Sequence, residues 1–138
     1  MTPMDPLKSE ILPIRSSEDI VRIRQAVRTM ALEIGLSLVD QTKVITAASE
    51  IARNTLDYGG GGEATIEIVS TGLRKGIRLR FVDEGPGIPD MQRAMTDGYT
   101  TGKGLGLGLS GAKRLVNEFE IESEVDKGTR ITLVRWKP

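Results

Sequence analysis

The chain of 138 residues contains no cysteine and no histidine. Without cysteine it can form no disulfide, offers no thiolate nucleophile and has no sulfur ligand for a metal, which suits a reducing cytoplasm. Without histidine it can build no Ser-His-Asp triad and no histidine-bound zinc site, and no histidine can carry a phosphoryl group.

Net charge and long hydrophobic runs are also missing. Nineteen basic and nineteen acidic side chains cancel, so bulk charge gives no support for nucleic-acid binding or attachment to a membrane surface. No apolar run approaches the roughly 18 residues of a membrane span. The first residues, 1–6, lack the basic and hydrophobic regions of a signal peptide. We therefore expect a cytoplasmic protein that acts on neither nucleic acid nor membrane.

Length and hydrophobic periodicity predict one domain over 1–138, with residues of about 1–9 flexible. Serines at 16 and 37 begin two helices, and glycines at 35 and 59 end them. In chain order we expect a short edge strand at 11–14, helices at 17–34 and 38–58, strands at 64–69 and 77–82, a short helix at 90–97, a third main helix over 112–118, and a final hairpin of strands at 119–125 and 130–136.

The second predicted helix carries three polar residues, Glu50, Asn54 and Asp57, within about 60° of one another on the side opposite its apolar stripe. A solvent-exposed face would account for them. Against that, Asn54 is a mediocre helix former in the middle of a helix, where lysine or glutamate would stabilise a solvated face better. On this helix alone, the solvent-exposed face remains the favoured interpretation.

Glycine occurs at nearly every second position from 102 to 111, just before the third predicted helix. Missing β-carbons let such a backbone approach a ligand and direct several N–H groups at a phosphate, and a helix N-terminus also favours an anion. The second hairpin strand ends at Asp83, and a turn with Gly85 and Gly87 follows. Asp83 either caps that turn or directs its carboxylate toward a ligand held by the glycine run.

Three common glycine motifs do not fit. A P-loop needs serine or threonine after its lysine, but Gly104 follows Lys103. Residues 106–111 match G-x-G-x-x-G, yet no strand leads into them and too little chain follows to build a parallel sheet. A protein-kinase glycine loop would require the histidine of the catalytic-loop signature, which is absent here.

Four short motifs follow one another along the chain: Glu50 with Asn54, the turn 83–88, the glycine run 102–109, and Gly128 with Thr129. In this order they resemble the N box, the first and second glycine boxes and the closing threonine motif of the GHKL (Bergerat-fold) ATPases. The resemblance covers about 19–136. It implies an α/β fold of the α+β two-layer type, with a mixed, mainly antiparallel sheet covered on one face by about three helices.

The resemblance also implies ATP and Mg²⁺ as cofactors. Asp83 would accept a hydrogen bond from the adenine amino group, Thr129 would reach the base directly or through water, and Asn54 would bind the Mg²⁺. Glu50 would be the catalytic base. Lys103 is either a cation that neutralises the transferred phosphoryl group or a solvated residue. The implied nucleotide-binding residues are Asn54, Asp83, Gly85, Gly87, Ile88, Gly102, Lys103, Gly104, Leu105, Gly106, Leu107, Gly108, Leu109 and Thr129.

Within that family, the short chain and the glutamate of the N box are similar to the anti-sigma-factor type serine/threonine kinases of bacterial partner switching, and most of all to the stressosome switch kinases. The resemblance implies a kinase that phosphorylates a STAS-domain antagonist or scaffold protein and then binds and activates a downstream phosphatase. Two alternatives stay open: an anti-sigma factor kinase that sequesters a sigma factor directly, and a non-catalytic ATP-gated binding module. Glu50 separates them, because a pure binding module needs no base.

Overall fold

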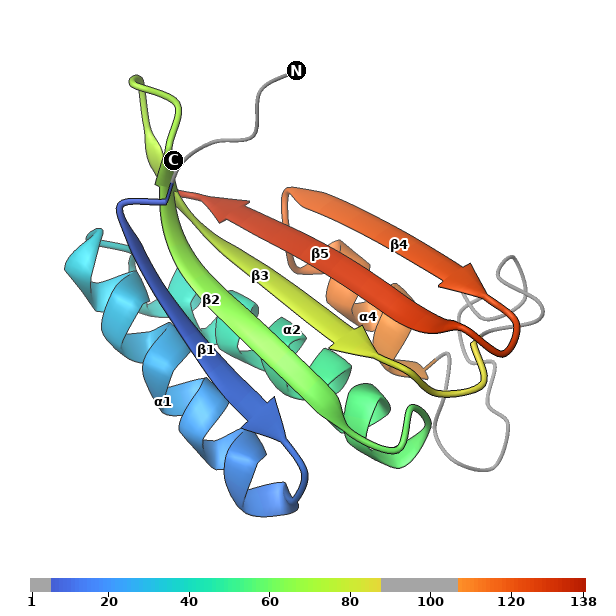
Figure 1. The fold of residues 1–138 in the computed structure, drawn as a ribbon. Coiled ribbons are helices and arrows are strands. Elements are labelled where there is room, and N and C mark those ends of the chain that lie inside the picture. Colours follow the sequence, from blue (N-terminus) through green and yellow to red (C-terminus); the bar gives the residue numbers. More distant parts are fainter. Residues whose placement is uncertain (1–5, 88–106) are drawn as a thin grey trace.

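A computed structural model describes residues 6–87 and 107–138, and these form two layers (Figure 1). One layer is a five-stranded sheet in the order β1-β2-β3-β5-β4, with every neighbouring pair antiparallel. The helices of the described ranges all cover the same face of it. The predicted two-layer fold is therefore confirmed. The elements are β1 (Lys8–Ile14), α1 (Ser17–Glu33), α2 (Leu38–Asp57), β2 (Gly62–Ser70), β3 (Lys75–Asp83), α4 (Leu107–Arg114), β4 (Glu118–Glu124) and β5 (Gly128–Trp136).

The two long helices begin at the serines that the sequence predicts. Ser37 accepts a hydrogen bond of 3.1 Å from the backbone N–H of Asp40 at the start of α2. At the start of α1 the carboxylate of Asp19 accepts one of 3.2 Å from the N–H of Ser16. These bonds satisfy donors that have no partner within a helix. After α1 the chain turns at Gly35, whose φ of 81° favours glycine.

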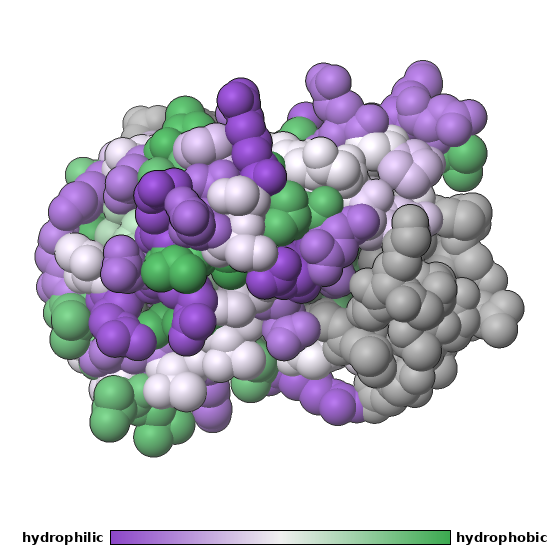
Figure 2. All heavy atoms as spheres, turned by 90° about the horizontal axis from the view of Figure 1, so that it is seen from below, coloured by the Kyte–Doolittle hydropathy of each residue, from purple (hydrophilic) through white to green (hydrophobic). Residues whose placement is uncertain are grey.

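The core lies between the layers, where apolar residues of α1 and α2 at helical spacing meet alternate residues of the central strands. Val44 and Ile51 of α2, with Leu79 and Phe81 of β3, are among its buried members. On the outer helix side, hydrophobic residues lie between hydrophilic ones (Figure 2). None of the described helices combines the length and hydrophobicity that crossing a bilayer requires.

Two predicted boundaries are wrong. The third main helix spans Leu107–Arg114 instead of 112–118, since Leu109 and Ala112, three residues apart, are both fully buried and carry the helix back into the glycine run. Residues 118–124 are strand β4. At the start of the chain the predicted edge strand begins at Lys8 instead of residue 11, because Lys8 and Ser9 pair with β2. The short helix predicted at 90–97 lies outside the described residues.

Candidate functional site

Asp83 is the last residue of β3 and stands opposite Thr129 of β5 in the antiparallel register. The N–H of Gly85 donates a hydrogen bond of 2.9 Å to its Oδ1. Burial raises the pKa of the Asp83 carboxyl above its usual range, and hydrogen bonds from the N–H groups of Gly85 and Thr129 oppose that rise in part. The structure thus places a partly desolvated carboxylate at the end of the sheet.

Glycines allow three chain segments to meet around Asp83. A β-carbon on Gly59, just after α2, would lie 2.4 Å from Asp83 Cγ, and one on Gly128 would lie 2.1 Å from the Asp83 carbonyl oxygen. A β-carbon on Gly85 would lie 2.7 Å from the Cα of Gly59. Any larger residue at these positions would push the segments apart.

The turn after β3 is held from two sides. The hydroxyl of Tyr58, at the end of α2, donates a hydrogen bond of 3.0 Å to the carbonyl of Gly87. The N–H of Asp126, in the β4–β5 turn, donates one of 2.8 Å to the carbonyl of Pro86. Gly87 has a φ of 76°, and a β-carbon there would lie 2.3 Å from the Glu124 carbonyl oxygen. Residues 83–87 of the predicted first glycine box therefore form a turn packed between a helix end and a hairpin.

Asn54 lies one helical turn before Tyr58 on α2, and its side chain reaches a small cavity below the sheet. Its Nδ2 atom is buried and has no hydrogen-bond partner among the described residues. A buried polar group without a partner is costly, and a 180° rotation of the amide presents its oxygen at the same place. An oxygen ligand for a cation is thus available here. The cavity is lined by Asn54, Thr55, Tyr58, Asp83, Leu109, Thr129 and Ile131.

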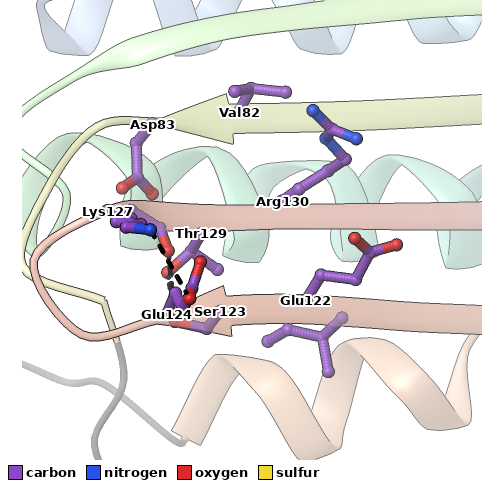
Figure 3. Close-up of a pocket in the computed structure, with 10 residues that line it drawn as sticks. Val82, Asp83, Glu122, Ser123, Glu124, Lys127, Thr129 and Arg130 are labelled. Carbon is purple, nitrogen blue, oxygen red and sulfur yellow. Dashed lines mark hydrogen bonds and ion pairs between the residues drawn. The ribbon is translucent and has the colours of Figure 1, made fainter.

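A larger cavity of about 560 Å³ is lined by the end of β3 and by the β4–β5 hairpin. Asp83 and Thr129 belong to the lining of both cavities, but Arg130 of the larger cavity precedes the core residue Ile131 along β5, so its side chain lies on the sheet face away from the helices. Figure 3 shows Asp83, Thr129 and Ser123 gathered near the strand ends, with Arg130 and Glu122 further along the sheet. The volume lies within the roughly 300–1,000 Å³ that is typical of ligand pockets.

The three residues of the predicted polar face of α2 do not share one environment in the structure. Glu50 is exposed and lies outside the residues that line the two cavities. Asp57 is exposed as well and forms an ion pair of 3.7 Å with Arg53. Asn54 alone turns inward. The solvent-face interpretation is therefore wrong for Asn54, whereas Glu50 and Asp57 are both exposed as it predicts.

Part of the predicted glycine loop can be located. Leu107 and Gly108 form the beginning of α4, and Leu109 is fully buried against the small cavity. The first N–H groups of a helix have no intrahelical acceptor, so those at the start of α4 are available to a ligand. The predicted residues Ile88, Gly102, Lys103, Gly104, Leu105 and Gly106 lie outside the described residues.

Three residues around this site were not predicted: Tyr58, Gly59 and Ser123. Tyr58 follows Asn54 by four residues, a spacing that places both on one helix face, so the pattern contained a signal for it. For Gly59 the sequence indicates only the end of a helix. Ser123 has no local signal, since its contact with Thr129 arises across the final hairpin.

Residues 39–138 match the family described as histidine kinase-, DNA gyrase B-, and HSP90-like ATPase. The chain is 45% identical over 123 residues to the serine/threonine-protein kinase RsbT of Bacillus subtilis (strain 168), which covers 89% of this chain and 92% of that protein. It is 30% identical over 132 residues to the anti-sigma F factor of Clostridium novyi (strain NT), covering 92% of this chain and 91% of the relative.

Solved structures agree on the fold. The crystal structure of the RsbU and RsbW domains of a Mycobacterium tuberculosis protein is similar with a TM-score of 0.66 and 20% identity, over 96% of this chain and 34% of that one. The catalytic domain of the histidine kinase ThkA is similar with a TM-score of 0.53 and 18% identity, over 93% of this chain and 96% of that one.

Proposed function

Because the chain belongs to the family of histidine kinase-, DNA gyrase B-, and HSP90-like ATPases, we propose that it is an ATP-dependent serine/threonine protein kinase of a bacterial partner-switching stress-response pathway. The 45% identity to RsbT over 89% of the chain supports the activity. The structural observation that carries the proposal is the meeting of Asn54, Asp83 and Thr129 around one cavity.

Asp83 and Thr129 bind the adenine in this proposal. The ionised Asp83 carboxylate already accepts a backbone hydrogen bond from Gly85 and has further lone pairs for the adenine amino group. Gly85 and Gly87 have no side chains, so the backbone of this turn can pass close under the base.

Asn54 holds Mg²⁺ in this proposal. The described residues include no group of three or more acidic side chains that could bind a metal by themselves, and Mg²⁺ commonly takes one or two protein ligands with phosphate and water oxygens. With the amide rotated so that its oxygen replaces the unpartnered Nδ2, Asn54 would supply one neutral oxygen ligand to such a set. When bound, the ion would neutralise charge on the phosphates.

Glu50 accepts the proton during transfer. It is exposed one helical turn before Asn54, where a serine or threonine of another protein can approach from solvent. The hydroxyl oxygen forms a bond to the γ-phosphorus, the bond from that phosphorus to the β–γ bridging oxygen breaks, and ADP leaves with the electron pair. The hydroxyl proton passes to the Glu50 carboxylate.

The protein substrate is a STAS-domain antagonist or scaffold protein, and after phosphorylation the kinase binds and activates a phosphatase. Residues 1–138 act as one domain, and the reaction takes place in the cytoplasm, where ATP is available. The 30% identity to an anti-sigma F factor favours one second candidate: a kinase that sequesters a sigma factor directly. A pull-down against phosphatase and sigma factor, with and without ATP, separates the two.

The proposal is tested by measuring phosphoryl transfer from labelled ATP to the STAS proteins of the same organism. Wild type, Glu50→Gln and Asn54→Ala are compared. Glu50→Gln should keep ATP affinity and lose roughly 10²- to 10⁴-fold in transfer rate, the usual contribution of a positioned base. Asn54→Ala should instead lose the magnesium-dependent part of ATP affinity in calorimetry.

Transfer at the wild-type rate by Glu50→Gln would remove Glu50 from catalysis. Binding of ATP without transfer to any STAS protein would favour the ATP-gated module. Unchanged magnesium dependence in Asn54→Ala would remove Asn54 from the metal.

A further inference from the structure

Arg53 lies on the exposed side of α2, three residues after Glu50 and one before Asn54. At roughly 100° per residue, Glu50 comes about 40° around the helix from Asn54, and Arg53 lies about 60° further in the same direction. Residues three apart are also neighbours on a helix surface. The order around α2 is therefore the inward-facing amide, the exposed carboxylate and then the arginine.

The guanidinium of Arg53 is held from two sides. Its Nη1 donates a hydrogen bond of 3.2 Å to the hydroxyl of Ser17, the first residue of α1. The same atom lies 3.7 Å from Oδ1 of Asp57, one turn further along α2. Figure 1 shows α1 and α2 side by side in opposite directions, so the start of α1 meets the end of α2. These contacts place the arginine at the junction of the two helices.

One edge of this guanidinium is available to another molecule. The two contacts use Nη1, and neither Nε nor Nη2 has a hydrogen bond or ion pair within residues 6–87 and 107–138. The N–H groups of Nε and Nη2 point the same way and can donate two parallel hydrogen bonds to one carboxylate. The Arg53 side chain is 47% exposed, so such a carboxylate can reach it from solvent.

The positions of Glu50 and Arg53 determine where a protein substrate lies. The γ-phosphate is bound on the Asn54 side in the proposed function, so the accepting hydroxyl lies at Glu50 and the rest of the substrate continues over Arg53. The carboxylates of Glu50 and Asp57 repel an acidic group at longer range, whereas direct contact with the available edge of Arg53 attracts it. The surface therefore favours one acidic side chain at one place.

We propose that Arg53 is a specificity-determining residue for the protein substrate. Its Nε–Nη2 edge binds the carboxylate of an aspartate or glutamate near the phosphoacceptor serine or threonine, and this contact places the acceptor hydroxyl at Glu50. The inference rests on the proposed function, in which Glu50 is the base. It adds a requirement on the substrate, which is an acidic side chain close to the phosphorylated residue.

Steady-state transfer from labelled ATP to the STAS protein tests this in wild type, Arg53→Ala and Arg53→Lys, with the ATP Kd measured by calorimetry. Arg53→Ala should raise the KM for the STAS protein roughly 10-fold, the effect of a charge-assisted bidentate pair at a half-exposed site. The change should fall on this KM and not on kcat or the ATP Kd. Arg53→Lys keeps the charge but loses the planar fork, so it should recover only part of the loss.

Variants of the substrate identify the partner of Arg53. Each aspartate or glutamate within about three residues of the phosphoacceptor, roughly 10 Å of extended chain, is changed in turn to asparagine or glutamine. One such change should raise KM for the wild-type kinase as much as Arg53→Ala does. The same change should raise KM no further for the Arg53→Ala kinase, because both remove one contact. If every change acts equally on both kinases, Arg53 binds no carboxylate and the inference is overturned.

Arg28→Ala is the matched control, because Arg28 is another exposed arginine of the helix layer, roughly 16 Å along α1 from Ser17. An unchanged KM for the STAS protein in Arg53→Ala would overturn this inference alone. A fall in kcat or ATP affinity without a change in that KM would also overturn it, because a merely structural tie between the helices acts in that way. Absence of transfer to any STAS protein by the wild type would overturn the proposed function, and this inference with it.

Discussion

Among single residues, Asp83 has the surroundings that most directly affect nucleotide binding. Burial raises its pKa above the ordinary value of about 3.9. Adenine binding needs the ionised form, so affinity should fall as the pH drops through the raised pKa, earlier than for an exposed aspartate. ADP affinity measured by calorimetry between about pH 4 and pH 7.5 checks this. Asp83→Asn should bind more weakly at neutral pH and lack this step.

Subtracting the pH profile of Asp83→Asn from that of the wild type cancels the contribution of the nucleotide's own phosphates, which titrate in both. In the protein without nucleotide, ionisation of the same carboxyl has the opposite effect: it lowers stability, whereas it raises nucleotide affinity. A carboxyl with a raised pKa takes up a proton more readily in the folded state, so its ionisation lowers the free energy of unfolding as the pH rises through that pKa. Identical profiles for wild type and Asp83→Asn would show that Asp83 does not meet the base.

Helix and strand boundaries can be predicted from the sequence where they are set by a cap, a glycine or an alternating pattern within a few residues. The serine caps at 16 and 37, the stop at Gly35 and both hairpins were predicted within two or three residues. The error at α4 arose because glycines favour a loop interpretation, whereas burial of Leu109 and Ala112 stabilises helix there. Packing against the core outweighed local propensity.

Of the candidate site, the sequence predicts only the residues that belong to known motifs. Asn54, Asp83 and Thr129 came from the resemblance, and the structure brings them to one cavity. The contacts of Tyr58 with Gly87 and of Ser123 with Thr129 join different elements. No periodicity or composition encodes such contacts, so only the fold reveals them.

The clamp between α2 and the turn after β3 leads to a further prediction. Tyr58→Phe removes only the hydroxyl that bonds Gly87, a loss of about 0.5–1.5 kcal/mol. If that bond keeps the turn in its binding geometry, ATP affinity should fall roughly 2- to 10-fold. Thr42→Val removes a hydroxyl contact of 2.9 Å at the opposite end of the same helix and is the control. Equal ATP affinity in both variants would limit Tyr58 to packing.

Across the whole molecule, the cavity joins parts of the chain that are far apart in sequence: the end of α2, the end of β3, the start of α4 and the start of β5. In the unfolded chain these segments are separated, so a nucleotide that contacts all of them binds the folded state alone. Binding and global stability are therefore coupled.

This coupling predicts a large thermal shift. At an ATP concentration of about 100 times Kd the folded state gains about 2.7 kcal/mol, and a domain of this length moves by about 4 °C per kcal/mol, so Mg-ATP should raise Tm by about 10 °C. The shift should grow with the logarithm of ATP concentration in differential scanning calorimetry. Asp83→Asn should lose most of it at the same concentration, because its Kd is higher. A full shift in that variant would mean that ATP stabilises the protein from a site elsewhere.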